Sequence, residues 1–293
     1  MNSLKKYFDI LFELGKVRIT FFVAITTSVG YLLYLGELST NIILPTIGVF
    51  LLACGSSSLN HFQEKDKDAL MDRTKGRPIP SGRISPNGAL VYAFTLIVIS
   101  SLIIFYSSNL TALILGWINL FWYNVIYTPL KRINSLAVIP GSIIGALPPV
   151  IGWTAAGGAL LDPKILAVAL FFFIWQIPHF WLLLMIYGKD YEKAGFPTLT
   201  KIFSNRQLSR ITFTWIAALA TSCLLIPLFD VSRNIISIVL IIVLGLILVF
   251  KTKNILTNYI EKIIFKKAFL QINLYLLAIV LILSLEKLLL IEF

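Results

Sequence analysis

Three oxygen-bearing side chains recur at every fourth residue in the segment Asn60–Thr74. Asn60, Glu64 and Asp68 would share one face of a helix, because each step of four residues turns about 40° and rises about 6 Å. Hard oxygen ligands of this kind suit Mg²⁺, which keeps several waters and commonly bridges to the phosphates of a substrate. The spacing therefore predicts a magnesium site that can neutralise the charge of a departing diphosphate.

The same segment supplies cations for phosphate oxygens. Arginine grips phosphate through its planar fork, whereas lysine acts as a compact point charge. The run Arg77–Pro86 is rich in proline and cannot continue a helix, so we expect a stiff loop that leads into the next helix. A solvated loop that only sets topology is the plain alternative, and the spacing of the acidic residues favours the metal site. The candidate phosphate ligands are Lys67, Arg73, Lys75 and Arg77.

The composition places these residues in a membrane protein. The chain has 293 residues, of which 58% are hydrophobic and 13% charged, and its mean hydropathy is +0.87. An ordinary soluble domain has about 25% charged residues, so apolar runs such as 235–250 leave too few polar positions for a water-facing exterior. We expect an all-α polytopic helix bundle with the lipid bilayer as its solvent. Cys54 and Cys223 lie in apolar runs and are interpreted as small buried side chains.

Nine segments are long and apolar enough to cross a bilayer, which requires about 20 residues each. Prolines 140, 148, 149 and 178 predict kinks or helix ends inside the bundle. The first apolar segment is interpreted as a retained helix, and the whole chain, 1–293, as a single domain. The predicted spans are residues 17–35, 42–60, 88–106, 109–127, 136–157, 164–187, 211–229, 235–250 and 268–290.

The basic residues of the chain are distributed unequally between the two sides of the predicted bundle. With the N-terminus in the cytoplasm, all but three of the 25 lysines and arginines fall on the cytoplasmic side, and the exceptions are Lys164, Arg233 and Lys287. This bias predicts an N-in, C-out orientation in the cytoplasmic membrane, with the active site facing the cytoplasm. Membrane topology accounts for the net charge of +11, and no nucleic-acid partner is expected.

The acidic segment resembles the first motif of the UbiA superfamily of intramembrane prenyltransferases, N-x-x-x-D-x-x-x-D, with Glu64 at the middle position. The continuation Met71-x-Arg73-Thr74-x-x-Arg77-Pro78-x-Pro80-x-Gly82 is similar to the haem O synthase branch of that superfamily. Further segments support the resemblance to this branch. They are Tyr127-Thr128-Pro129-Leu130-Lys131-Arg132-x-Asn134, Gly141-x-x-x-Gly145-Ala146-x-Pro148-Pro149-x-x-Gly152-Trp153, Trp175-Gln176-x-Pro178-His179-Phe180 and Asp190-Tyr191-x-x-Ala194-Gly195-x-Pro197.

The resemblance implies a reaction in which farnesyl diphosphate donates its farnesyl group to a vinyl group of protohaem IX (haem B), with addition of water and release of diphosphate. It implies Mg²⁺ held by Asn60, Glu64, Asp68 and Asp190, and haem-delivering or haem A-forming membrane enzymes as partners. Many superfamily members carry a second D-x-x-x-D motif after the sixth span. Here residue 194 is alanine, so only Asp190 of that motif is carried over.

Three cations are expected to stabilise the negative charge that builds as the diphosphate leaves: Arg73, Lys131 and Arg132. Lys131 and Arg132 have two alternatives, which are binding of haem propionates and simple anchoring of the topology. Asp190, beside Lys189 and Lys193, could equally form a surface ion pair.

Aromatic and imidazole side chains complete the candidate substrate site. The faces of Tyr127 or Trp153 could stabilise an allylic cation, or these residues could mark the membrane interface. His179 is ionisable inside a span, so it could ligate haem iron, or it could hydrogen-bond between helices beside Pro178. The remaining expected substrate contacts are Arg77, Trp175, Gln176 and Tyr191.

Two rival functions remain open at this point. The same transfer could use another acceptor, such as an aromatic quinone precursor or a chlorophyllide. The chain could instead be a transporter or channel, in which the acidic residues would line a path. Transporters place such charges near the bilayer midplane, whereas most acidic residues here cluster at one predicted membrane face.

Overall fold

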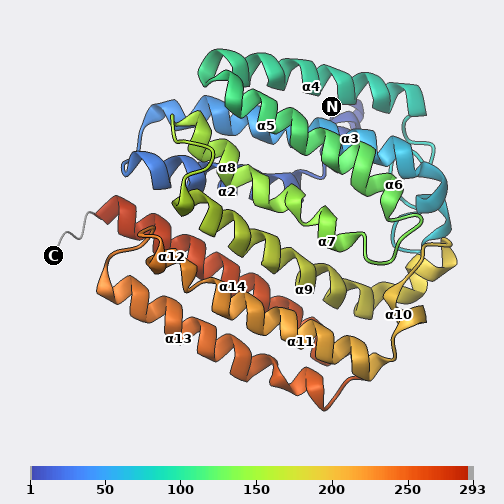
Figure 1. The fold of residues 1–293 in the computed structure, drawn as a ribbon. Helices are drawn as coiled ribbons and strands as arrows, with labels where there is room; N and C mark the ends of the chain where they lie inside the picture. Colours follow the sequence, from blue (N-terminus) through green and yellow to red (C-terminus); the bar gives the residue numbers. More distant parts are fainter. Residues whose placement is uncertain (1, 290–293) are drawn as a thin grey trace.

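The computed structural model describes residues 2–289. Its regular elements are all helical, and the long helices lie side by side as one bundle, with the loop after α3 and helix α10 at one end and the end of α14 at the other (Figure 1). The elements are α1 Asn2–Leu14, α2 Val17–Leu35, η1 Thr40–Ile42, α3 Ile43–Leu70, α4 Pro86–Ser107, α5 Leu110–Phe121, η2 Trp122–Tyr127, α6 Thr128–Leu130, α7 Val138–Gly141, α8 Ile143–Ala155, α9 Pro163–Lys193, α10 Leu199–Ile202, α11 Asn205–Ser222, α12 Leu225–Leu228, α13 Ile235–Thr252, η3 Lys253–Leu256 and α14 Lys262–Leu289.

Nine candidate membrane spans occur within residues 2–289, which confirms the predicted polytopic all-α fold. Their surface is that of a membrane protein, because large apolar side chains such as Phe94, Leu246 and Phe250 are more than half exposed along the spans. The candidate spans are Val17–Leu35, Thr40–Leu70, Pro86–Ser107, Leu110–Leu130, Val138–Ala155, Pro163–Lys193, Asn205–Leu228, Ile235–Leu256 and Lys262–Leu289. The predicted end of the ninth span at residue 290 lies outside the described residues.

Two spans run farther than hydropathy indicated, and both extensions carry candidate site residues. Helix α3 continues from the predicted end at residue 60 to Leu70, and α9 continues from 187 to Lys193. Neither extension contains a proline or glycine that would end a helix, apart from Gly188 near the start of the second one. The predicted loop after the sixth span therefore begins later than expected, and Asp190 and Tyr191 belong to the last turn of a helix.

The fourth and fifth spans are interrupted. The prolines predicted breaks in the fifth span, whereas the break in the fourth was not predicted. The fourth changes from α-helix to π-helix at Trp122–Tyr127 before a short turn, Thr128–Leu130. A π-turn inserts a residue into a helical turn and often lies at functional sites. The fifth consists of α7 and α8 separated at Ser142, and Pro148 and Pro149 lie inside α8. Such breaks are tolerated inside a membrane bundle because neighbouring helices shield the backbone N–H and C=O groups that lose their helical hydrogen bonds.

A short helix that hydropathy did not predict precedes the first span. Helix α1 packs Leu14, which is fully buried, against Ile79 and Ala89 of the loop and helix that follow α3. The Glu13 carboxylate pairs with the Arg83 guanidinium at 2.7 Å. The N-terminal segment therefore braces the arginine- and proline-containing loop at one end of the bundle.

Helices α2 and α8 cross at backbone contact through two glycines. A β-carbon added at Gly152 would lie 1.8 Å from the carbonyl oxygen of Thr27, and one added at Gly30 would lie 1.8 Å from that of Pro149. Because backbone atoms cannot move aside as side chains do, both positions require glycine. Small residues that allow such close approach are typical of helix interfaces in membranes.

Substitution of Gly152 tests this crossing. Gly152→Ala is expected to destabilise the fold by about 1–3 kcal/mol or more, because the added methyl group overpacks the α2–α8 contact. Gly245→Ala is the matched control, since its β-carbon would meet its nearest atom at an ordinary 3.4 Å. Thermal unfolding of the two purified variants in detergent measures the difference. Equal melting temperatures would contradict the close crossing.

Candidate active site

The acidic stripe of α3 lies at the end of the helix and is buried. Asn60 is 1% exposed, Glu64 6% and Asp68 0%. Their spacing of four residues on a continuous helix places all three on one face. Burial of two carboxylates in a membrane bundle is unfavourable unless each has a compensating partner, so the partners define the site.

Glu64 is compensated by a lysine from the segment that follows the π-helix. Lys131 Nζ lies 2.7 Å from Glu64 Oε2, and the Asn60 amide donates to the same oxygen at 3.2 Å and to the Thr128 hydroxyl at 3.0 Å. The Lys131 ammonium also lies 5.3 Å from the centre of the Tyr127 ring. Tyr127 and Lys131 are four residues apart on the same short helical segment and thus reach the stripe together.

Asp68 is compensated by the loop that follows its own helix. Arg77 Nη1 donates to both carboxylate oxygens of Asp68, at 2.8 and 2.7 Å. The loop turns back because its residues form successive turns, and the Thr74 hydroxyl donates to the Asp68 carbonyl oxygen at 2.9 Å. The arginine expected to grip phosphate therefore holds a carboxylate in this structure.

Lys16 is a third cation at the stripe, and its role was not predicted from the sequence. Its ammonium group donates to Asn60 Oδ1 at 3.1 Å, and its backbone is left-handed, with φ 46°. Burial, together with the charges of Arg77 and Lys131, lowers the pKa of Lys16 to about 7. A basic residue directly before the first span was the available signal, but topology explained it equally well.

The end of α9 closes over the loop after α3. Arg73 Nη2 lies 3.4 Å from the Tyr191 hydroxyl, and its guanidinium lies over the rings of Tyr187 and Tyr191 at 5.6 and 5.9 Å from their centres. The Lys67 ammonium donates to the Ala194 carbonyl at 2.7 Å. These contacts bring the Asp190–Pro197 segment of the resemblance to the same end of the bundle as the acidic stripe.

The structure does not bring Asp190 and Arg132 into direct contact with the carboxylates of the stripe. Among residues 2–289, the Asp190 carboxylate has neither a hydrogen bond nor an ion pair to Asn60, Glu64 or Asp68. Arg132 is exposed and donates to the Gln63 carbonyl oxygen, so it braces α3 from outside.

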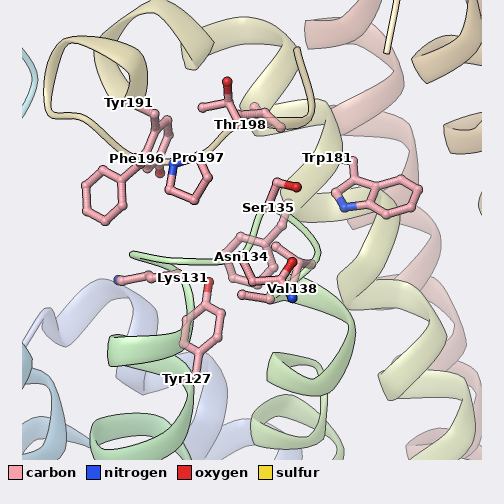
Figure 2. Close-up of a pocket in the computed structure, with 13 residues that line it drawn as sticks. Tyr127, Lys131, Asn134, Ser135, Val138, Trp181, Tyr191, Phe196, Pro197 and Thr198 are labelled. Atoms are coloured by element: carbon pink, nitrogen blue, oxygen red, sulfur yellow. The ribbon is translucent and has the colours of Figure 1, made fainter. Parts of the chain in front are cut away.

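A pocket lies between the segment that follows the π-helix and the end of α9 (Figure 2). Tyr127 and Lys131 approach it from one side, and Tyr191, Phe196 and Pro197 approach it from the other, as Figure 2 shows. Its volume of ≈ 80 Å³ is well below the roughly 300–1,000 Å³ of typical ligand sites. A prenyl diphosphate would therefore require these side chains to separate. The remaining lining residues are Asn134, Ser135, Ala137, Val138, Phe180, Trp181, Leu184 and Thr198.

Three of the predicted contacts lie deeper, on α9. The Trp175 indole nitrogen and Gln176 Oε1 are buried without a hydrogen-bond partner among the described residues. His179 Nδ1 lies 3.0 Å from Asn273 Oδ1 of α14, so the hydrogen bond between helices that was one alternative for His179 is present.

Trp153 lies at the opposite end of the bundle from the acidic stripe. Its indole donates to the Ala159 carbonyl at 3.1 Å and packs edge-on against Tyr34. Tyr34 is 18 residues, about 27 Å of helix, from Lys16. The expected contact of Trp153 with an allylic cation is therefore not supported, because α8 carries Trp153 to the end of the bundle where Tyr34 and the end of α2 lie.

The donor set at the stripe fits magnesium shared with a phosphate. Glu64 Oε1 is buried with no hydrogen-bond partner, which leaves an acceptor for a hard cation. Within the described part of the chain, no group of three or more His, Cys, Asp or Glu side chains could hold a metal ion by itself. A metal ion here would thus need further oxygens from a bound diphosphate.

Comparison with known proteins identifies the family. The profile of the UbiA prenyltransferase family matches residues 23–281. The chain belongs to this family. It is 44% identical over 182 residues, 62% of its length, to protoheme IX farnesyltransferase of Geobacter sulfurreducens, of which 67% is covered. It is 34% identical over 249 residues to the protein of the same name from Cytophaga hutchinsonii, covering 84% of this chain and 86% of that one.

Solved structures of other proteins share the fold. A structure of digeranylgeranylglyceryl phosphate synthase superposes with a TM-score of 0.78 at 17% identity, covering 98% of this chain and 99% of that one. A UbiA homologue from Archaeoglobus fulgidus bound to GPP and Mg²⁺ superposes with a TM-score of 0.65 at 16% identity, covering 94% and 99%. The chain is therefore a multi-pass membrane prenyltransferase with this family's helical architecture.

Lys16 offers a test of the charge arrangement. Lys16→Gln keeps a donor for Asn60 and removes the charge, so binding of inorganic diphosphate with Mg²⁺ is expected to weaken about tenfold. Hydrogen bonds to charged groups contribute about 1.5–3 kcal/mol, against about 1 kcal/mol for neutral ones. Isothermal titration calorimetry measures the affinity, and Lys6→Ala on the exposed surface of α1 is the control. Unchanged affinity in Lys16→Gln would show that this amine does not face the diphosphate.

Proposed function

We propose that this UbiA-family prenyltransferase converts protohaem IX to haem O by transferring a farnesyl group from farnesyl diphosphate to a vinyl group of the haem. The choice of substrates is supported by relatives at 34–44% identity that carry the name protoheme IX farnesyltransferase. The chemistry is supported by one structural observation: a buried acidic stripe meets cations from three other segments at one rim of the bundle.

Asn60, Glu64 and Asp68 would hold Mg²⁺ against the diphosphate, and Asp190 would approach as the end of α9 and the loop after α3 close on the substrate. When bound, Mg²⁺ withdraws charge from the diphosphate oxygens and so improves the leaving group. The Archaeoglobus fulgidus homologue bound to GPP and Mg²⁺ supports this assignment by its fold. The partnerless oxygen of Glu64 supports it by its chemistry.

Substrate binding would exchange the partners of each charge. Lys131 and Arg77 now neutralise Glu64 and Asp68. Once the metal ion neutralises these carboxylates, both cations, together with Lys16 and Arg73, become available to phosphate oxygens. Each buried charge would then keep a partner of opposite sign, which avoids the several kcal/mol that a buried unpaired ion costs. Arg132 would act as a positioning residue for α3 through Gln63.

The transfer step breaks the bond between the farnesyl C1 and the diphosphate oxygen and leaves the electron pair on diphosphate. Tyr127, which stacks with Tyr123 at a 6.0 Å ring distance beside the pocket, would face the allylic cation. The terminal vinyl carbon of the haem then bonds to C1. Water adds to the other vinyl carbon and loses a proton, giving the hydroxyethylfarnesyl group. Closure of the pocket excludes bulk water from the first of these steps.

The decisive experiment incubates the purified protein with haem B, Mg²⁺ and labelled farnesyl diphosphate. Mass analysis is expected to detect haem O, and Asp68→Asn is expected to lower the rate by about 10²-fold or more, because the leaving charge is no longer neutralised. Asp66→Asn is the matched control: it lies on the same helix, and its side chain is 86% exposed. Transfer of the label to an aromatic acid instead of haem would overturn the choice of acceptor. An unchanged rate in Asp68→Asn would overturn the metal role.

We also propose that the chain is a single domain of the cytoplasmic membrane, with the acidic stripe at the cytoplasmic face. Two of the three basic residues outside the predicted cytoplasmic side lie near one another, because the Arg233 backbone N–H donates to Glu286 Oε1 at 2.8 Å and Glu286 directly precedes Lys287. This proximity supports the prediction that the basic residues are distributed unequally between the two sides of the membrane. Haem-delivering or haem A-forming membrane enzymes would supply the acceptor and take the product.

The orientation is testable with cysteine labelling. In a variant without Cys54 and Cys223, a cysteine introduced at Ser81 is expected to be protected from a membrane-impermeant maleimide in intact cells, whereas one at Ser108 is expected to react. Ser81 lies in the loop beside the acidic stripe, and Ser108 in the short connection at the other end. The reverse pattern would contradict the N-in orientation.

A further inference from the structure

The hydrogen bonds around His179 determine which of its ring nitrogens carries the proton. The Asn273 amide nitrogen donates to the Phe269 carbonyl of its own helix at 2.5 Å. Its Oδ1 is therefore turned toward His179 and accepts a hydrogen bond from Nδ1 at 3.0 Å. This assigns the proton of the neutral ring to Nδ1 and leaves the lone pair on Nε2.

His179 Nε2 is an accessible lone pair in the interior of a membrane span. It has no hydrogen-bond partner among the described residues. Both nitrogens of His61 are fully buried polar atoms without a partner, whereas Nε2 of His179 is not fully buried. The rings of Trp175 and Phe269 pack against the imidazole, with 4.6 and 4.7 Å between the ring centres. These contacts hold the orientation of the imidazole. An ionisable side chain inside a span, oriented but with one nitrogen unused, is a candidate ligand.

The position of His179 relates this nitrogen to the proposed site. Asp190 follows eleven residues later on the same helix, which returns it to nearly the same face about 16 Å away, at the rim. Phe180, the next residue, contacts the His179 ring and lines the pocket with Lys131. One face of α9 thus has an imidazole nitrogen in the apolar part of the bundle and a carboxylate at the polar end.

We propose that His179 Nε2 is the axial ligand of the acceptor haem's iron, and that Asn273 is the positioning residue that holds the ligating tautomer. This inference rests on the proposed function, because it requires haem as the acceptor. A neutral imidazole whose other nitrogen donates to an oxygen acceptor is the usual form of a metal-bound histidine. Fixing the iron would hold the vinyl edge of a flat, apolar substrate in register with the farnesyl C1.

A purely structural role for His179 makes a different prediction. Joining α9 to α14 requires only a donor to Asn273 Oδ1, and the amide of glutamine at residue 179 can supply one. His179→Gln would then preserve the fold and haem binding alike. Iron ligation requires the imidazole itself, so the same variant separates the two roles.

The first experiment records absorption and electron paramagnetic resonance spectra of the purified proteins with ferric haem B. The wild-type protein is expected to show histidine-ligated haem, and His179→Gln to lose that signature. His179→Gly is expected to regain it when free imidazole is added. His61→Gln is the matched control, because the chain has only two histidines and His61 is enclosed. A spectrum that is the same in wild type and His179→Gln would overturn the proposal.

The second experiment tests the positioning role of Asn273. Asn273→Leu is expected to weaken haem affinity about 10–100-fold, the usual cost of losing the partner of a metal-bound histidine. Asn273→Asp is expected to lower the midpoint potential of the bound haem, because a carboxylate partner makes the imidazole more electron-donating. A merely structural Asn273 would leave that potential unchanged, and this result would overturn its role.

Two further readouts separate the failure of this proposal from other failures. Mg²⁺-dependent binding of farnesyl diphosphate is expected to stay within twofold in His179→Gln, which would show that the variant is folded. If the wild-type protein produces haem O but has the same haem spectrum as His179→Gln, the proposed function is supported and the assignment of the iron ligand is wrong. If the wild-type protein neither binds nor modifies haem, both fall.

Discussion

The structure depends on the compensation of two carboxylates that are buried at the rim of a membrane bundle. Glu64 and Asp68 each require a cation, and the cations come from elsewhere in the chain: Lys131 from the end of the fourth span and Arg77 from the loop after α3. Breaking such a buried pair typically costs about 3–5 kcal/mol. The requirement therefore ties the π-helical segment and the arginine loop to α3.

Long helices make this arrangement possible. Helices α3 and α9 extend beyond the apolar stretches that anchor them, and their ends bring polar side chains from both halves of the chain to one rim. On α9, His179 lies about three helical turns farther into the bundle than Asp190 and is surrounded by aromatic rings. A polar end for the diphosphate and an apolar interior for a prenyl chain and a flat acceptor thus belong to one helix. The membrane supplies the apolar surroundings that a soluble fold would have to enclose by itself.

Local patterns predicted much of this protein. The nine spans followed from runs of about 20 apolar residues, and the first, Val17–Leu35, agrees with its predicted bounds. The stripe of Asn60, Glu64 and Asp68 followed from helical periodicity, which is also local. The second and sixth spans were predicted to end too early, because hydropathy registers where lipid-facing residues stop. It does not register where a helix stops.

What the amino-acid sequence determined by itself was the membrane fold and the family motif, since each depends on residue types at short spacing. Only the tertiary structure decided that Arg77 pairs with Asp68, that Lys16 reaches Asn60, that Trp153 lies at the far end and that Asn273 orients His179. Arg77 and Asp68 are 9 residues apart in the sequence, and His179 and Asn273 are 94 residues apart. The physical reason is that a buried charge or ring nitrogen takes whichever partner packing brings within about 3 Å, and packing is a property of the whole bundle.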